Sequence, residues 1–285
     1  MTPASTFTDL VATSSDAANA AHRQPELSER AQRQAEVLAA LRPHVPAHAL
    51  LYQSEDTTPY ECDGLTAYRQ RPLVVCLPET YAQVQAVLKA CHAVGAPVIA
   101  RGAGTGLSGG AMPHPMGVTL SLAKFNKILS VDAYSRTALV QCGVRNLAIS
   151  EAAAPYGLYY APDPSSQIAC TIGGNVAENS GGVHCLKYGL TVHNVLKVKG
   201  FTIEGEPVEF GSDALDTPGM DLLAIMIGSE GMLAVVTEVT VKLIPKPQLA
   251  RCIMASFDDV RKAGAAVAAV IAAGIIPAGL EMMDK

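Results

Sequence analysis

A run of ten residues from Arg101 to Gly110 holds the residue types best suited to chemistry in this sequence. Its letters are RGAGTGLSGG, and five of them are glycines. Glycine adopts positive φ freely and lets a ligand approach the main chain closely. Successive backbone N–H groups in such a run can turn toward one point and bind an anion. The apolar residues 98–100 just before the run read as a buried strand. The run therefore predicts a phosphate-binding loop at the end of a strand.

Two familiar phosphate-binding motifs do not fit this run. Three of its glycines match the spacing of the dinucleotide fingerprint, but that motif needs a helix directly after it and an acidic residue about 20 positions on. Pro113 and Pro115 exclude the helix, and no carboxylate lies between the run and Asp132. A P-loop would end in Gly-Lys-Ser/Thr, whereas this run is followed by Ala111. A flexible surface linker is the alternative interpretation, which the preceding strand and a second glycine cluster downstream weaken.

Two further glycine-bearing segments lie downstream. In the first, Gly173-Gly174 and Gly181-Gly182 flank a short helical piece of small and polar residues. A helix that starts there has free N–H groups, and small side chains let a flat ligand lie against the backbone. In the second, the residues from Gly228 to Gly231 turn into a long apolar strand.

Composition excludes several classes of protein. The chain has 285 residues, 49% of them hydrophobic and 16% charged, which is typical of a globular protein with one large or two smaller domains. A net charge of −5 gives no basic field for nucleic acid, and no apolar run reaches the roughly 18 residues of a membrane span.

Cysteine and histidine patterns do not predict a metal site. The seven cysteines are scattered and odd in number, without a Cys-x-x-Cys motif. This favours reduced thiols in the cytoplasm over disulfides, zinc or an iron–sulfur cluster. His44 and His48 have the helical spacing of metal ligands, but Pro43 and Pro46 break the helix that they would need.

The elements that position these loops follow from hydrophobic periodicity and from helix-capping residues. We expect a loose tail over 1–25 and an irregular stretch over 43–72. The other expected elements are helices over 26–42, 80–94, 146–155 and 221–227, strands over 73–77, 98–100, 117–122, 128–131, 138–141 and 232–243, and a hairpin over 195–203 and 207–210. Beyond these, a strand over 251–257, a helix over 259–273 and the start of a strand over 280–283 are too few to bury a core. We therefore expect a second domain that is cut off at residue 285.

Three motifs in one β-rich chain now resemble a known family. They are RGAGTGLSGG at 101–110, IGGNVA at 172–177 and GSEGML at 228–233. In this order they are similar to the FAD-linked oxidases of the vanillyl-alcohol oxidase / p-cresol methylhydroxylase (PCMH) type. Segments 59–65, 143–147 and 182–189 are similar to the FAD-linked subunits of its glycolate-oxidising branch.

The resemblance covers about residues 45–285 and implies an α+β fold. After a helix and lead-in over 26–70, a PCMH-type FAD-binding domain of two α/β subdomains would span 71–246. The incomplete start of an α+β substrate, or cap, domain would span 247–285.

The resemblance also implies which residues hold FAD. The first motif would cradle the pyrophosphate, the second would flank the flavin ring, and the third, with the strand after it, would line the dinucleotide. Plain core packing is the alternative for Val235 and Val236. The candidates are Arg101, Gly102, Ala103, Gly104, Thr105, Gly106, Gly109, Ile172, Gly173, Gly174, Asn175, Ala177, Gly182, Glu230, Gly231, Val235 and Val236. Relatives with covalent flavin often carry histidine where this chain has Thr105, so we expect non-covalent FAD.

The implied activity is oxidation of a 2-hydroxy acid, in which the Cα hydrogen passes to the flavin as hydride and a base takes the hydroxyl proton. Glycolate would give glyoxylate, with D-lactate and D-2-hydroxyglutarate as alternative substrates. A non-catalytic flavin-binding assembly module is the alternative from another class. Electrons would pass through partner subunits, one an iron–sulfur protein, toward a quinone, which places the protein in the cytoplasm or peripherally at the inner face of the membrane.

The catalytic residues are not among those identified. The family's catalytic half carries a His-rich motif with Gly-Asp-Gly-Asn and a later Glu-His pair, and this sequence contains neither. For His184 and His193 we favour a turn or packing role over catalysis. We therefore expect the chain to bind FAD without oxidising glycolate by itself.

Overall fold

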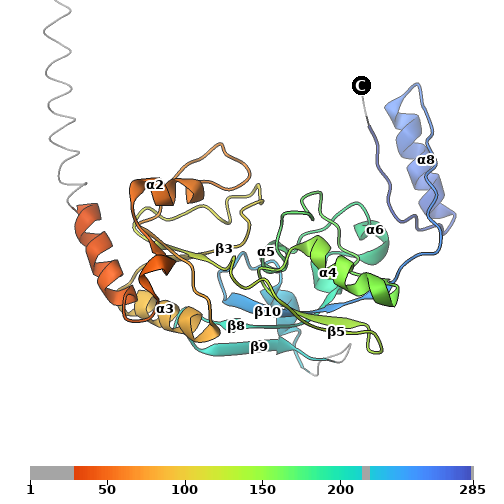
Figure 1. Cartoon of the computed structure of the whole chain (residues 1–285). Helices are drawn as coiled ribbons and strands as arrows, with labels where there is room; N and C mark the ends of the chain where they lie inside the picture. The colour runs from red at the N-terminus through yellow and green to blue at the C-terminus, as the bar shows by residue number, and fades with distance from the viewer. Residues whose placement is uncertain (1–28, 214–218, 284–285) are drawn as a thin grey trace, which may run out of the picture.

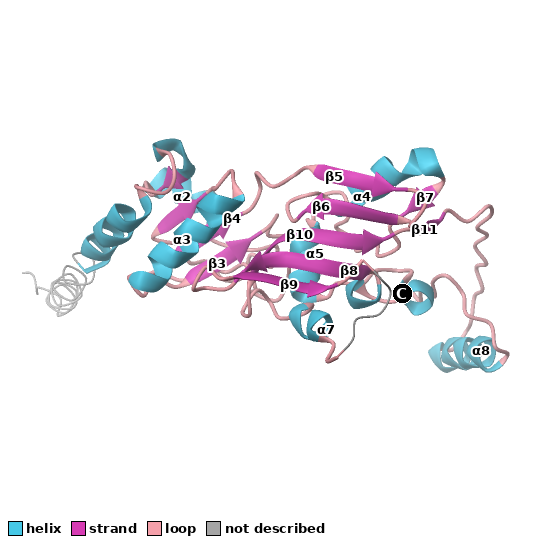
Figure 2. Cartoon of the chain, turned by 90° about the horizontal axis from the view of Figure 1, so that it is seen from below, coloured by secondary structure: helices cyan, strands magenta, loops and turns pink. Residues whose placement is uncertain are grey.

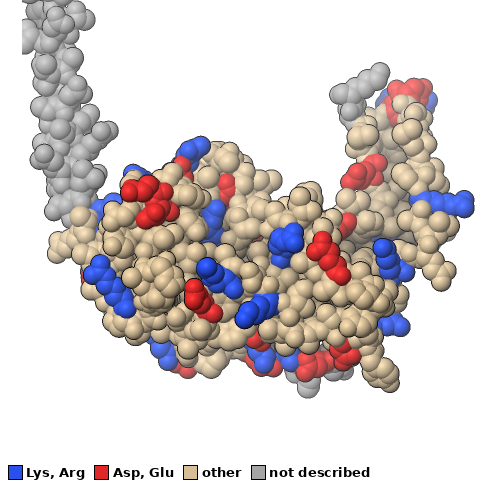
Figure 3. Space-filling view, in the orientation of Figure 1, with Lys and Arg blue, Asp and Glu red and all other residues tan. Residues whose placement is uncertain are grey.

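The computed structural model describes residues 29–213 and 219–283, so the expected tail over 1–25 lies outside the described residues. Two sheets lie side by side to form the body, and α8 (Val260–Ala272) stands apart from it on an arm (Figures 1 and 2). Figure 3 shows positive and negative side chains interspersed over this face of the body.

The first sheet has the order β1-β2-β4-β3. Its strands are β1 (Leu50–Leu51), β2 (Val74–Cys76), β3 (Val98–Arg101) and β4 (Val118–Ser121). The last three are parallel, and β1 adds an antiparallel edge. Helix α3 (Tyr81–Ala93) connects β2 to β3 and begins with a capping box between Thr80 and Gln83. The helical residues 29–41 add Val37, Leu38 and Leu41 to the core beneath this sheet.

The second sheet is antiparallel, with the order β5-β6-β10-β8-β9. Its strands are β5 (Ile128–Asp132), β6 (Thr137–Gln141), β8 (Val195–Phe201), β9 (Pro207–Gly211) and β10 (Val235–Lys242). Helices α4 (Asn146–Ala153), α5 (Ile172–Glu178) and α7 (Leu222–Met226) accompany it. Buried side chains of β10 pack with Ile172 and Val176 of α5, so α5 is fixed to the core of the second sheet.

Several shorter elements complete the described chain. They are α2 (Ser54–Thr57), α6 (Cys185–Tyr188), the two-stranded pair β7 (Leu158–Tyr159) and β11 (Ile244–Pro245), and 3-10 turns at Ala47–Ala49, Thr58–Tyr60, Ala154–Tyr156 and Thr191–His193. No helix in the described ranges is long and apolar enough to cross a bilayer.

Two side-chain hydrogen bonds connect α3 to the second sheet. Gln141 donates from Nε2 to the Tyr81 hydroxyl at 2.8 Å, and Gln85 donates from Nε2 to the Gly205 carbonyl at 2.8 Å. These contacts fix the spacing of the two sheets, and with it the position of the β3 end relative to α5.

The structure differs from the expected elements mainly at the C-terminal end. The β-α-β unit, the hairpin and the helices are present, but the strands expected over 251–257 and 280–283 are wrong. The backbone there pairs with no strand of the described chain, and Ile253 and Met254 are 91% and 90% exposed. A strand needs a neighbour for its main-chain hydrogen bonds, and apolar composition alone does not supply one.

Candidate functional site

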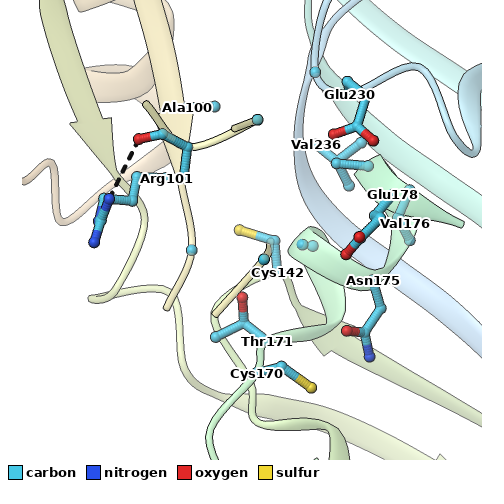
Figure 4. Close-up of a pocket in the computed structure, with 18 of the residues that line it drawn as sticks. Ala100, Arg101, Cys142, Cys170, Thr171, Asn175, Val176, Glu178, Glu230 and Val236 are labelled. Atoms are coloured by element: carbon cyan, nitrogen blue, oxygen red, sulfur yellow. Dashed lines mark hydrogen bonds between the residues drawn. The ribbon is translucent and has the colours of Figure 1, made fainter. Parts of the chain in front are cut away.

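A cavity lies between the end of β3 and helix α5, where the two sheets meet. It is open to solvent on one side, and its water-accessible volume is about 160 Å³. Residues 100–111 form one side, which we call the loop wall. Residues 170–180 and 226–236 supply the facing side, the helix wall, as Figure 4 shows for the labelled residues.

The loop wall presents main-chain groups to the cavity. The amides of residues 102–106 donate no hydrogen bond within the described part of the chain. Glycine is required at two of these positions. Gly104 has a φ of +70°, and a Cβ there would lie 2.3 Å from Arg101 Nη2. A Cβ on Gly102 would lie 2.3 Å from Thr171 Oγ1. Unpaired amides on a closely approached loop suit an anion such as a phosphate.

Arg101 directs its charge away from the cavity. Its guanidinium donates from Nη1 to the carbonyls of Cys62 at 2.9 Å and Ala111 at 3.3 Å, and lies 5.6 Å from the Tyr60 ring centroid. Figure 4 shows the side chain pointing away from Glu178 and Glu230. Burial lowers the pKa of Arg101, but guanidinium stays charged in proteins. The guanidinium of Arg101 therefore fixes the loop, while other atoms of the residue line the cavity.

The helix wall presents side chains as well as backbone. The hydroxyl oxygens of Thr171 and Ser180 are buried without a hydrogen-bond partner, and both residues line the cavity. A buried hydroxyl without a partner costs free energy, so these two groups fit a ligand that offers them hydrogen bonds. A Cβ on Gly173 would lie 2.7 Å from Cys142 Cβ, which explains why the second residue of α5 is a glycine.

Two carboxylates, those of Glu178 and Glu230, lie at the exposed part of the helix wall. Glu230 has a φ of +54°, in a turn between Gly228 and Gly231, and its amide donates to the Ala177 carbonyl at 2.8 Å. Its Oε2 lies 2.6 Å from where a Cβ on Gly110 would be, so it reaches the loop wall. Burial first, and then the Glu178 carboxylate, raise the pKa of Glu230.

Most of the residues singled out from the sequence meet at this cavity. Those that line it are Arg101, Gly102, Ala103, Gly104, Thr105, Gly106, Gly173, Gly174, Asn175, Ala177, Glu230, Gly231, Val235 and Val236. Three others lie outside its lining. Gly109 donates its amide to Asp63, Ile172 is fully buried in the core of the second sheet, and Gly182 packs against the Asp163 carbonyl.

Several lining residues are not marked by the motifs of the sequence. They include Thr171, Ser180, Glu178, Cys142 and Cys170. The first three flank the second glycine motif, and that position could have indicated them, whereas nothing local marks the two cysteines. His184 lies outside the lining, where its Nδ1 is 2.6 Å from Asp163 Oδ2.

Comparison with known proteins gives the family. Residues 72–211 match the family of FAD binding domains, and residues 246–285 match the C-terminal domain of FAD linked oxidases. The chain belongs to the FAD-linked oxidases. Its cofactor is FAD, and the sequence-based expectation of a PCMH-type FAD-binding domain is confirmed.

This FAD-linked oxidase is similar to several curated proteins and solved structures. The glycolate oxidase subunit GlcD of Escherichia coli (strain K12) is 65% identical over 249 residues, which are 87% of this chain and 50% of the relative. A D-lactate dehydrogenase of Anaerostipes hadrus is 37% identical over 225 residues, 78% of this chain and 47% of the relative. The solved alkyldihydroxyacetonephosphate synthase shares the fold, with a TM-score of 0.67 over 75% of this chain and 41% of its own, at 22% identity. The chain spans about half the length of the curated relatives it matches.

The residues of this FAD-linked oxidase fit its cofactor. The unpaired amides of 102–106 suit the pyrophosphate, and the small residues at the start of α5 leave room for a flat ring. The unpartnered hydroxyls of Thr171 and Ser180 suit the polar atoms of the same ligand.

Proposed function

We propose that this chain supplies the FAD-binding part of a 2-hydroxy-acid oxidation that converts glycolate to glyoxylate. The observation that supports this most is the cavity with its unpaired amides, in a chain 65% identical to a glycolate oxidase subunit. When bound, FAD supplies the acceptor for the hydride that leaves the substrate Cα.

The chain's own residues would bind and orient the cofactor. Each amide of residues 102–106 that meets a charged oxygen contributes roughly 1.5–3 kcal/mol. Gly173 and Gly174 let a ring approach the backbone of α5, and Val235 and Val236 give the cavity an apolar side that excludes water. The described residues contain no group of three or more His, Cys, Asp or Glu side chains placed to hold a metal ion.

We propose that FAD is held without a covalent bond. Thr105 occupies the loop, and the cavity thiols belong to Cys142 and Cys170. Burial raises the pKa of Cys142 to about 12 and also raises the pKa of Cys170. Thiols in this state are protonated at neutral pH and are poor nucleophiles. Acid precipitation of the purified protein should leave the yellow colour in the supernatant, and a yellow pellet would show a covalent link.

The substrate is tested by anaerobic titration of two FAD-loaded proteins, the 285-residue chain and the same chain extended to the length of its relatives. Glycolate should bleach the flavin absorbance of the extended protein faster than D-lactate or D-2-hydroxyglutarate, and the 285-residue chain should bind FAD without being bleached by glycolate. Faster bleaching by D-lactate would favour the second candidate, which the 37% identical D-lactate dehydrogenase supports. No bleaching by any of the three acids in either protein would favour a non-catalytic flavin-binding module.

We further propose that the chain works within a complex. The similar Escherichia coli protein is described as a subunit, and an iron–sulfur partner that passes electrons toward a quinone follows from the family resemblance. The protein should then be found in the cytoplasm, with part of it at the inner face of the membrane. Purification from the native source under mild conditions should give FAD and iron in one complex, and FAD without any co-purifying iron protein would contradict this.

A further inference from the structure

The loop wall is held on its outer side by a short segment from the lead-in. This segment, residues 60–65, is called the brace here. None of its residues lines the cavity, yet they contact the loop wall at its start, middle and end.

The far end of the loop wall is tied by Asp63. This carboxylate is only 4% exposed. Its Oδ2 accepts a hydrogen bond from the Gly109 amide at 2.9 Å, and its Oδ1 accepts one from the Leu65 amide at 3.0 Å. Gly109 has a φ of +83°, a conformation that glycine holds only loosely without such a tie. One buried carboxylate therefore joins the brace to the loop.

The middle and start of the loop wall are tied by backbone and by Arg101. The Gly64 amide donates to the Gly106 carbonyl at 3.0 Å, and Arg101 joins the carbonyls of Cys62 and Ala111. The fit is close, because a Cβ on Gly64 would lie 2.8 Å from the Thr105 carbonyl oxygen.

These ties matter because the loop cannot hold its own shape. Residues 102–111 are almost all Gly, Ala, Ser or Thr, and fixing such a backbone costs conformational entropy at each residue. The amides of 102–106, which donate no hydrogen bond within the described residues, do not stabilise the loop before an anion arrives. The apparent affinity of such a loop is its intrinsic affinity multiplied by the fraction of time that the loop spends in the binding conformation. A loop that is rarely in that conformation therefore binds weakly.

We propose that Asp63 is a positioning residue for FAD: its carboxylate holds the loop wall in the binding conformation before the cofactor arrives. The inference rests on the FAD site described above, since it concerns the same loop. It adds a residue that lies outside the cavity and 46 positions before its partner Gly109.

The test compares Asp63→Ala with Asp56→Ala in the 285-residue chain. Asp56 is an exposed acid of the same lead-in and serves as the matched control. FAD is titrated into the apo-protein, and hydrogen–deuterium exchange is measured without FAD. Asp63→Ala should weaken FAD binding roughly 10- to 100-fold, since two hydrogen bonds to a charged group are lost. It should speed exchange at the Gly109 and Leu65 amides, which lose their acceptor, and leave β2 and β4 unchanged. Asp63→Asn, which keeps one acceptor oxygen, should restore part of the affinity, and Asp56→Ala should match the wild type.

Each other outcome is decisive. Wild-type affinity in Asp63→Ala overturns the proposal, and so does faster exchange throughout β2 and β4, because the carboxylate would then only stabilise the fold. If Asp63→Ala does not fold, Asp63→Asn decides, because it keeps the shape of the side chain and replaces one of the two acceptor oxygens. Unchanged FAD affinity in that variant overturns the proposal. Failure of the wild-type chain to bind FAD would instead contradict the FAD site and the proposed function.

Discussion

The two walls of the cavity are built in different ways. The loop wall offers main-chain amides, and its shape depends on ties to a segment outside the cavity. The helix wall is rigid because Ile172 and Val176 are packed in the core of the second sheet, and it offers side chains such as the unpartnered Thr171 hydroxyl. A change in the loop wall should therefore disturb many contacts at once, whereas a change in the helix wall should remove one.

The largest effect is expected from Gly104→Ala in the loop wall. The new Cβ meets the Arg101 guanidinium and forces the loop out of shape, so several amides lose the pyrophosphate together. FAD affinity should fall by about 100-fold or more, the equivalent of two charge-assisted hydrogen bonds. Fluorescence titration with FAD measures this.

Gly95→Ala is the matched control for that change. Gly95 also has a positive φ, +62°, but a Cβ there meets nothing within 4 Å. Both variants carry the same backbone strain of roughly 1–2 kcal/mol, so both should lose stability. Only Gly104→Ala should lose FAD affinity, and equal losses in the two variants would show that strain alone is responsible.

A smaller and opposite pattern is expected from Thr171→Val in the helix wall. The change removes a buried hydroxyl that has no partner in the apo-protein, so the melting temperature without FAD should rise or stay level. FAD affinity should fall by about 3- to 10-fold, since one neutral hydrogen bond contributes roughly 0.5–1.5 kcal/mol. Differential scanning fluorimetry with and without FAD gives both values.

Thr119→Val provides the comparison, because the Thr119 hydroxyl is also buried without a partner but lies on β4, outside the cavity lining. In Thr119→Val the melting temperature without FAD should also rise or stay level, and FAD affinity should not change. If Thr171→Val binds FAD as tightly as Thr119→Val does, the Thr171 hydroxyl has no role toward the cofactor.

The smallest effect is expected from Glu230→Gln. The pKa of Glu230 is raised, so its negative charge disappears at a higher pH than that of an ordinary glutamate. Wild-type FAD affinity should therefore rise as pH falls through that raised pKa, because repulsion of the anionic cofactor is lost. Glu230→Gln should bind FAD about 2-fold more tightly at neutral pH and low salt and should respond less to acid. Glu206→Gln, on the exposed hairpin turn, should change neither the FAD affinity at neutral pH nor its response to acid.

The sequence predicted what depends on local pattern. Glycines mark the loop wall and the start of α5, and apolar periodicity marks the strands that carry them. It did not predict the brace, because Asp63 and Gly109 are far apart in the sequence and neither position follows a pattern that indicates the other. It also assigned Ile172 to the cofactor because that residue lies within a glycine motif, whereas the helical turn directs it into the core. The strands expected over 251–257 and 280–283 are absent because pairing is a long-range property.

Hydrogen–deuterium exchange of the wild-type chain with and without FAD tests the central claim most directly. If both walls hold the cofactor, FAD should slow exchange at the amides of 102–106 and in the first turn of α5, with little change in β5 and β9 at the far edges of the second sheet. If FAD slows exchange in one wall alone, only that wall binds the cofactor. Protection confined to the arm that carries α8, or unchanged exchange over 102–106, would contradict the account.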